Sequence, residues 1–239
     1  MNIAVIFAGG VGRRMNAKDK PKQFLVVHGK PIIVHTLEIF QKHEEIDGIA
    51  LACLEDWIPY MEELKEEYHL TKLGVITKGG ETGQMSIYNA LKAAADTYGI
   101  EENIVLIHDG VRPLIDDQTI TDNIEAVKQY GSAITCGPAI ESVVLTDNGS
   151  DIATVAPRNN SRVAKAPESF YLKDILAAQE DSIAKGITDE IDSCALMAHH
   201  GMTMHIVEGG TGNIKITTPE DFYMFKAIYD SRENSQLDT

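Results

Sequence analysis

Residues 3–15 read IAVIFAGGVGRRM. The first six are apolar and rich in β-branched side chains, which predicts a buried β-strand that ends at Ala8. The glycines that follow let backbone N–H groups approach a phosphate oxygen without interference from a Cβ atom. The stretch therefore predicts a strand that runs into an anion-binding turn, with a plain tight turn flanked by surface bases as the alternative.

Predicted strands and helices alternate through the rest of the first half of the chain. Further strands are predicted at 48–54, 73–77, 104–108 and 133–136, and helices at 32–40, 57–68, 84–98 and 120–130. This alternation predicts an α/β fold, Rossmann-like, with a mostly parallel sheet covered by helices on both faces. Ligands bind beyond the carboxyl ends of the strands in such sheets. Residues 8–15, 78–86 and 108–113 are therefore the candidate site segments.

Residues 141–158 depart from the alternation. Two runs rich in β-branched residues, 142–146 and 151–155, flank the turn sequence Asp147-Asn148-Gly149-Ser150, which is a strong β-hairpin pattern. A two-stranded ribbon by itself is marginal in water. We therefore expect a protruding arm that packs on something else, such as another subunit.

The remainder of the chain predicts more helices than strands. Helices are predicted at 172–185, 189–200 and 218–229, and short strands at 204–207 and 214–217. The polar residues 231–239 are expected to form a frayed tail. With 239 residues, the chain fits one large domain better than two, and we assign this domain to residues 1–230.

Composition disfavours several classes of partner. Acidic residues outnumber basic ones 36 to 21, which gives a net charge of −15. Such a charge disfavours nucleic acid and anionic membranes as partners, but it allows a small anionic substrate if bases gather in one cleft. Cys53, Cys136 and Cys194 form no Cys-x-x-Cys pair, so neither a disulfide framework nor a thiolate zinc site is indicated. Without a basic leader or a span of about 20 apolar residues, we expect a cytoplasmic protein.

Bases do gather after the first strand. Between Gly9 and Lys22 there are three glycines and five bases, of which Arg14 and Lys22 are the candidate fixed cations. The dinucleotide-binding fingerprint fits worse because Met15 stands where its third glycine belongs. A Walker-type loop also fits worse, since the Gly-Lys pair at residues 29–30 is followed by proline.

This opening resembles that of cytidylyltransferases that act on polyol phosphates, namely the 2-C-methyl-D-erythritol 4-phosphate and the ribitol-5-phosphate enzymes. The matching segments run in the family's order over residues 1–230. They are Ala8-Gly9-Gly10-x-Gly12-x-Arg14-Met15, Pro21-Lys22-Gln23, His108-Asp109-Gly110-Val111-Arg112-Pro113, Thr188-Asp189-Glu190 and Asn213-Ile214-Lys215-Ile216-Thr217-Thr218-Pro219.

The resemblance implies roles for individual residues. The catalytic cations would be Arg14, Lys22, Arg158 and Lys215. The CTP-binding positions would be Ala8, Gly9, Gly10, Gly12, Gly79, Gly80, Ser86 and Gly110. The polyol phosphate would be bound by Ser142, Arg158 and Lys215, and Mg²⁺ by Asp109.

Each implied role has a structural alternative. Asp109 could cap the following turn and Ser86 could cap a helix, while Arg158 and Lys215 could be solvated surface charges. We expect Arg112 to brace its loop rather than to touch substrate. The adjacent histidines His199 and His200 point apart on a helix, so they are expected to be solvated rather than a metal pair.

The resemblance favours D-ribitol 5-phosphate as the acceptor, because the Ala-Gly-Gly opening and the 215–219 segment look more like the ribitol branch. That branch implies a role in teichoic acid or other cell-surface polysaccharide synthesis. Methylerythritol 4-phosphate, another polyol phosphate and a non-catalytic nucleotide-binding relative are the alternatives. The resemblance also implies a homodimer, joined by the arm at residues 141–158, in which Arg158 serves the partner's site.

Four positions depart from the family pattern. Family members usually have arginine at Gly83, alanine or serine at Gly110, and Thr-Pro-Gln where this chain has Ala-Pro-Glu at 166–168. From sequence, the Gly83 change is expected to weaken triphosphate binding or alter loop closure, and Glu168 is expected to add negative charge near the anion site.

Overall fold

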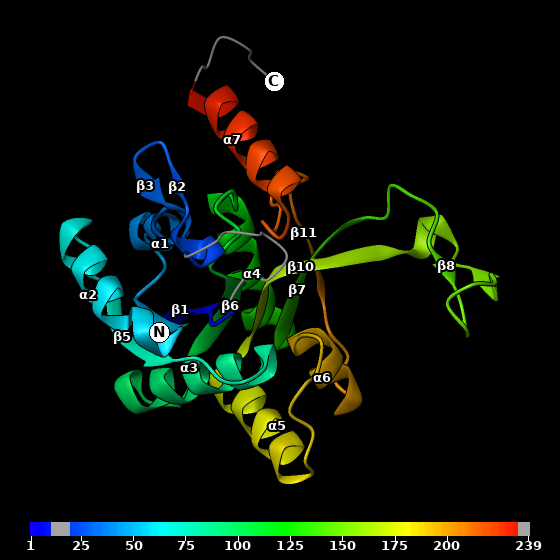
Figure 1. Ribbon diagram of the computed structural model, residues 1–239. Helices are drawn as coiled ribbons and strands as arrows, with labels where there is room; N and C mark the ends of the chain where they lie inside the picture. The colour runs from blue at the N-terminus through cyan, green and yellow to red at the C-terminus, as the bar shows by residue number, and fades with distance from the viewer. Residues whose placement is uncertain (11–19, 234–239) are drawn as a thin grey trace.

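The computed structural model describes residues 1–10 and 20–233 (Figure 1). A seven-stranded sheet lies at its centre in the order β11-β7-β10-β6-β1-β4-β5. The strands of this sheet, in chain order, are β1 (Asn2–Ala8), β4 (Gly48–Cys53), β5 (Leu73–Lys78), β6 (Ile104–Asp109), β7 (Ser132–Pro138), β10 (Arg162–Tyr171) and β11 (Ile206–Glu208).

The part of the chain just given contains seven α-helices. They are α1 (Ile32–Lys42), α2 (Ile58–Glu67), α3 (Gly83–Tyr98), α4 (Asp117–Tyr130), α5 (Leu172–Ala184), α6 (Ser193–His199) and α7 (Pro219–Glu233). Among them, none is long and apolar enough to cross a membrane.

Two apolar cores lie on opposite faces of the sheet. Alternate residues of β1 serve both, because successive side chains of a strand point to opposite faces. Ala4 and Ile6 pack with α1, α2 and α4, whereas Ile3 and Val5 pack with α3 and α5. The predicted α/β fold with helices on both faces is therefore confirmed.

The sheet is mostly parallel, with β10 as the exception. β1 pairs in parallel with β4 and β6, as β4 does with β5 and β7 with β11. β10 is antiparallel to both of its neighbours, β6 and β7. The sequence pattern did not predict this central strand, whose residues 165, 167 and 168 are lysine, proline and glutamate.

Three expectations about the C-terminal third are wrong in detail. Residues 214–217 form no strand, because the backbone N–H groups of Thr217 and Thr218 donate to the Asp221 carboxylate at the start of α7. The helix predicted at 189–200 begins at Ser193, where Asp192 caps it by accepting from the Ala195 N–H (2.7 Å). Finally, α7 continues to Glu233, into the segment expected to fray.

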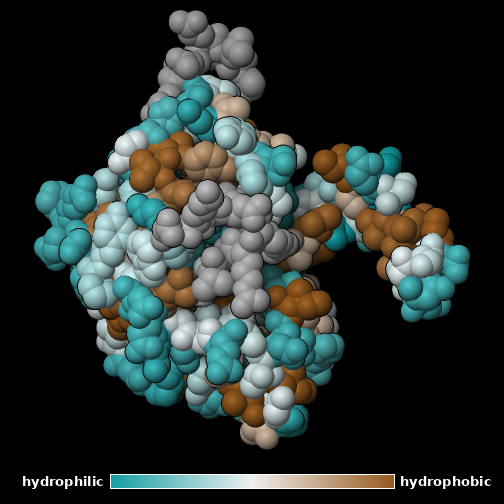
Figure 2. All heavy atoms as spheres, in the orientation of Figure 1, coloured by the Kyte–Doolittle hydropathy of each residue, from teal (hydrophilic) through white to brown (hydrophobic). Residues whose placement is uncertain are grey.

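The predicted hairpin forms an arm that projects from the body (Figure 1). Its strands β8 (Val144–Leu145) and β9 (Thr154–Val155) are shorter than expected and pair antiparallel as a separate ribbon. All residues from 141 to 160 are exposed except the half-buried Ala156. Figure 2 shows apolar residues gathered on this arm, and Ile140 and Ile152 are 79% and 65% exposed.

Candidate active site

A cavity of about 630 Å³ lies at the carboxyl ends of the parallel strands. It is lined by Phe7, Ala8, Gly9, Gly10, Lys22, Gln23, Leu54, Gly80, Glu81, Thr82, Gly83, Ser86, Asp109, Val111 and Lys215. Except for Lys22, Gln23 and Lys215, these residues follow or end β1, β4, β5 and β6, which is where ligands bind in sheets of this kind. All three candidate segments named from sequence contribute to the lining.

Two glycines let the ends of β1 and β5 approach each other. A Cβ atom on Gly9 would lie 2.6 Å from Ser86 Oγ, and one on Gly79 would lie 3.1 Å from the Cα of Gly9. Ser86 Oγ accepts from the N–H of Gly80 (3.0 Å) and donates to the carbonyl of Thr82 (2.9 Å). Ser86 thus holds the 79–82 loop together, while Thr82 is the residue that caps α3.

Gly110 lies behind the cavity wall. A Cβ atom there would fall 2.5 Å from Ile33 Cδ1 and 3.0 Å from the Cβ of Ala8. Its carbonyl accepts a hydrogen bond from Thr36 (3.2 Å). The alanine or serine that family members usually have at this position would need room for a Cβ atom. In this chain Ile33 of α1 fills that space.

Lys22 is carried by a short 3-10 helix, η2 (Lys22–Phe24), at the cavity's edge. Phe24 is fully buried and stacks on Trp57 with ring centroids 4.5 Å apart. Gln23 donates to the Ala8 carbonyl (2.7 Å), and Lys22 Nζ donates to the Ile216 carbonyl (2.9 Å). η2 is thereby fastened to the end of β1 and to the segment that carries Lys215.

Asp109 is the buried charge of the site, with 6% of its side chain exposed. Its Oδ1 pairs with Lys215 Nζ (2.6 Å) and its Oδ2 with Arg112 Nε (2.7 Å). Burial acts to raise the pKa of Asp109, but the cations of Lys215 and Arg112 outweigh it and hold this pKa below its usual value. Asp109 is therefore ionised at neutral pH.

Asp109 is also the residue that could hold a divalent cation. Within residues 1–10 and 20–233, no three His, Cys, Asp or Glu side chains are grouped as a metal site would require. A single ionised carboxylate fits Mg²⁺, which is commonly held by one or two carboxylates together with substrate phosphates and water. Each carboxylate oxygen can accept more than one partner, so the two ion pairs of Asp109 leave it able to serve as a ligand.

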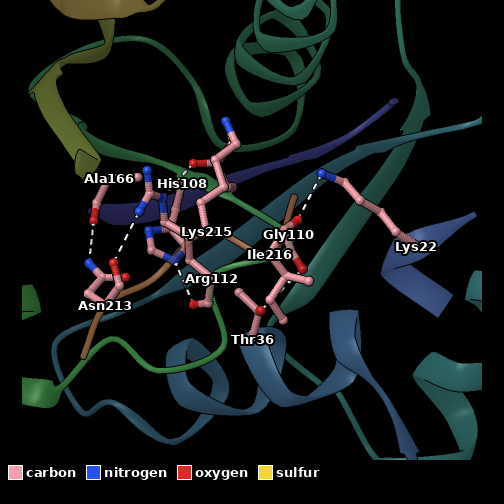
Figure 3. A network of polar contacts seen from close by, with 10 residues as sticks. Lys22, Thr36, His108, Gly110, Arg112, Ala166, Asn213, Lys215 and Ile216 are labelled. Atoms are coloured by element: carbon pink, nitrogen blue, oxygen red, sulfur yellow. Dashed lines mark hydrogen bonds and ion pairs between the residues drawn. The ribbon is translucent and has the colours of Figure 1, made fainter. Parts of the chain in front are cut away.

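Arg112 braces the loop after β6, as expected (Figure 3). Besides Asp109, it donates from Nη1 to the Asn213 carbonyl (3.1 Å), while the side chain of Asn213 donates to the carbonyl of Ala166 (2.7 Å). Burial lowers the pKa of His108 to about 4, so the ring is neutral and its Nε2–H donates to the Arg112 carbonyl (3.1 Å). This network ties β6, β10 and the 213–216 segment together.

The chain is similar to the proteins of one known family. The family model for 2-C-methyl-D-erythritol 4-phosphate cytidylyltransferase (IspD) matches residues 2–231. The chain belongs to this cytidylyltransferase family. The resemblance to polyol-phosphate cytidylyltransferases is thereby confirmed.

Individual members of the IspD family align with nearly the whole chain. A protein named ribitol-5-phosphate cytidylyltransferase from Streptococcus agalactiae is 58% identical over 99% of this chain and 98% of its own length. One of the same name from Vibrio parahaemolyticus is 49% identical over 99% of both chains. The crystal structure of 4-diphosphocytidyl-2C-methyl-D-erythritol synthase from Anaerococcus prevotii superposes with a TM-score of 0.82 at 26% identity and 96% coverage of both chains.

The structure brings most of the expected IspD-family positions together. Ala8, Gly9, Gly10, Lys22, Gly80, Ser86, Asp109 and Lys215 line the cavity, with Gly79 and Gly110 directly behind it. Gly12 and Arg14 lie outside the described residues. Ser142 and Arg158 are exposed on the arm and do not line the cavity of their own chain.

Glu168, which departs from the IspD-family pattern, is buried in β10 and is not among the residues that line the cavity. Its Oε2 accepts from the backbone N–H of Cys194 at the start of α6 (3.0 Å). Burial, followed by the nearby charge of Asp192, raises the pKa of Glu168 to about 8, so the group is neutral at pH 7. This raised pKa disfavours the added negative charge that was expected near the anion site.

Some lining residues were not singled out from sequence. Leu54 directly follows β4, so the rule that ligands bind beyond strand ends would have found it. Gln23 belongs to the Pro-Lys-Gln motif, but its contact with Ala8 depends on how η2 packs. Gly83, by contrast, was named from sequence as a departure from the family pattern; it lines the cavity, and a Cβ atom there would meet nothing within 4 Å.

Proposed function

We propose that the protein transfers the cytidylyl group of CTP to D-ribitol 5-phosphate, producing CDP-ribitol and pyrophosphate. The observation that carries the proposal is the 58% identity, over nearly the full length, to a protein named ribitol-5-phosphate cytidylyltransferase. Methylerythritol 4-phosphate is the alternative acceptor. It is supported by the name of the family model and by the likeness to the Anaerococcus synthase, at the lower identity of 26%.

The reaction needs little acid–base chemistry. A phosphate monoester has a second pKa of about 6, so the acceptor is already mostly a dianion at neutral pH. One of its oxygens forms a bond to the α-phosphorus of CTP, and the bond from that phosphorus to the oxygen bridging to the β-phosphate breaks. Pyrophosphate leaves with the electron pair, and catalysis consists of positioning and charge stabilisation.

In this proposal the cations of the cavity stabilise different phosphate groups. Lys22, together with Arg14, stabilises the negative charge on the α-phosphate and on the leaving pyrophosphate. Lys215 exchanges its contact with Asp109 for the acceptor's phosphate. A Mg²⁺ ion held by Asp109 would neutralise part of the triphosphate charge.

We further propose a homodimer in which the arm completes the partner's site. Arg158 and Ser142 are remote from the cavity of their own chain, and the arm has exposed apolar side chains that a partner would cover. The planar guanidinium of Arg158 suits a two-point grip on a phosphate. CTP as the donor makes the cytoplasm the proposed setting, and CDP-ribitol would supply ribitol phosphate for teichoic acid or other cell-surface polysaccharide.

The proposal is tested by measuring pyrophosphate release from CTP and Mg²⁺ with a panel of polyol phosphates. We expect D-ribitol 5-phosphate to give the highest kcat/KM. Preference for methylerythritol 4-phosphate would establish the alternative acceptor. CTP binding without pyrophosphate release from any acceptor would identify a non-catalytic relative instead.

A further inference from the structure

The two cations that pair with Asp109 differ in how firmly they are held. The side chain of Arg112 is 11% exposed, and besides its contact with Asp109 Oδ2 (2.7 Å) it donates to the Asn213 carbonyl (3.1 Å). The side chain of Lys215 is 42% exposed. Its Nζ pairs with Asp109 Oδ1 (2.6 Å) and lies 5.9 Å from the centre of the Phe7 ring. Arg112 is therefore the fixed partner of Asp109, and Lys215 is the partner that can leave.

The backbone that carries Lys215 is fixed on both sides. Before it, the Asn213 carbonyl accepts from Arg112 (Figure 3). After it, the N–H of Ile216 donates to the Val111 carbonyl (3.0 Å), and the Ile216 side chain is fully buried. A change in side-chain rotamer is therefore enough for Lys215 to leave the carboxylate and extend into the cavity that it lines.

A divalent cation on Asp109 would weaken the pair with Lys215. The carboxylate has room for a further ligand, but an ammonium group and a divalent cation on the same carboxylate repel each other. This repulsion is strong where little water screens it, and the side chain of Asp109 is 6% exposed. Since Arg112 is anchored elsewhere, Lys215 is the cation expected to leave.

We propose that Asp109 couples metal binding to acceptor binding: before ligands bind it holds Lys215, and a divalent cation on Asp109 releases Lys215 to bind the phosphate of the acceptor. This inference rests on the proposed use of CTP, Mg²⁺ and a polyol phosphate. Coupling between two binding events is reciprocal. Removal of Lys215 should therefore strengthen metal binding, and removal of the Asp109 charge should strengthen acceptor binding. Both effects are opposite in sign to the loss of a residue that only binds the ligand concerned.

The metal side is tested by calorimetric titration of CTP without acceptor, once with excess Mg²⁺ and once with EDTA. The ratio of the Kd in EDTA to the Kd in Mg²⁺ measures what the metal contributes to CTP binding. It also removes most of the direct effect that a substitution has on the nucleotide. For Lys215→Met we expect this ratio to be at least about fivefold higher than for the unsubstituted protein, which is the lower end of typical coupling factors.

Lys165→Met is the matched control for loss of a lysine charge. Burial, followed by the charge of Arg112, lowers the pKa of Lys165, so this lysine of β10 shares the surroundings of Arg112. Its Nζ donates to the Gly210 carbonyl (3.2 Å), and the pair of Lys215 with Asp109 stays intact in the variant. Its ratio should stay within about twofold of that of the unsubstituted protein, because a charge without direct contact to the carboxylate acts on it more weakly.

The acceptor side is tested by titration of D-ribitol 5-phosphate in EDTA and without nucleotide. We expect the Kd of Asp109→Asn to be at least about fivefold lower than that of the unsubstituted protein, because the amide no longer holds Lys215 by charge. Glu81→Gln is the control, since it removes a carboxylate from an exposed residue of the same cavity lining. Its Kd should change less than about twofold, because an exposed charge is screened by water.

Circular dichroism verifies that each variant is folded, and the two sides of the test use different residues, so either variant decides if the other fails to fold. A ratio that does not rise in Lys215→Met, or an acceptor affinity that does not rise in Asp109→Asn, would overturn the coupling. Pyrophosphate release by the unsubstituted protein would still uphold the proposed function in that case. Failure of the unsubstituted protein to bind CTP, or to release pyrophosphate with any acceptor, would instead contradict the proposed function on which the coupling rests.

Discussion

The cavity and the arm differ in whether their side chains find partners within the same chain. At the cavity, charged groups are satisfied within the chain, since Asp109 pairs with both Lys215 and Arg112. On the arm, apolar side chains are left in solvent, with Val144, Leu145 and Val155 each about half exposed. The polar groups of the cavity thus find partners within the same chain, whereas these apolar side chains of the arm are not covered by the chain that carries them.

This difference indicates which part of the proposed site a single chain can build. A contiguous apolar surface on a protruding ribbon is a typical protein-binding feature, and the arm carries two of the residues proposed for the acceptor phosphate. The nucleotide half of the site is therefore expected to form in each chain, and the acceptor half to require the partner.

The largest effect is expected within the cavity. Lys22→Ala should lower kcat at least about a hundredfold, because one preorganised cation or donor at the reacting group is typically worth ~3 kcal/mol. Steady-state pyrophosphate release measures it. Lys92→Ala, which removes an exposed lysine of α3, is the control and should retain activity. Near-normal turnover of Lys22→Ala would remove Lys22 from the mechanism.

A mixing experiment tests the division between the two regions directly. Lys22→Ala and Arg158→Ala chains, each nearly inactive alone, are allowed to exchange subunits. If Arg158 acts in the partner's site, each mixed dimer has one intact site, so activity should recover to about a quarter of normal when half the dimers are mixed. No recovery after exchange verified by mass spectrometry would mean that each site is built within one chain.

Removing the arm's apolar surface should have a smaller effect. Shortening the hairpin across residues 144–154 should yield monomers by light scattering and lower activity at least about tenfold, because the partner loses both its contact surface and its acceptor-side groups. Replacing the polar turn residues Asp147 and Ser150 with alanine is the control, and it should leave dimers intact. Dimers that persist after shortening would place the interface elsewhere.

The smallest effect concerns how the acceptor is gripped. Arg158→Lys keeps the charge but loses the planar, two-point contact, so KM for D-ribitol 5-phosphate should rise about fivefold with little change in KM for CTP. Initial rates at varied concentrations of each substrate measure both constants. Equal changes in the two KM values would show that Arg158 does not distinguish acceptor from nucleotide.

Periodicity predicted the parallel part of the fold well because its strands are continuous apolar runs. It missed β10, where Lys165, Pro167 and Glu168 interrupt the pattern. Their polar groups find partners only in the folded chain: Lys165 donates to the Gly210 carbonyl and Glu168 accepts from Cys194. A sequence pattern counts such residues against a strand because it cannot see the partners.

The residues of the candidate site could likewise be predicted only in part from the sequence. The cavity residues were predictable because strand ends meet at one edge of a parallel sheet, as Ala8 and Asp109 do. The direction of Glu168 was not, since it depends on α6 packing over the sheet. The role of Arg158 was expected only from the family resemblance, and the cavity of its own chain does not include this residue.

The stack of Trp57 on Phe24 has a practical consequence. Trp57 is the single tryptophan of the chain, and Phe24 belongs to the same short helix as Lys22. A ligand that draws Lys22 away from the Ile216 carbonyl acts on the short helix whose Phe24 ring lies against this indole. The protein therefore contains its own optical reporter, and its intrinsic fluorescence offers a label-free way to follow the entry of a triphosphate in real time.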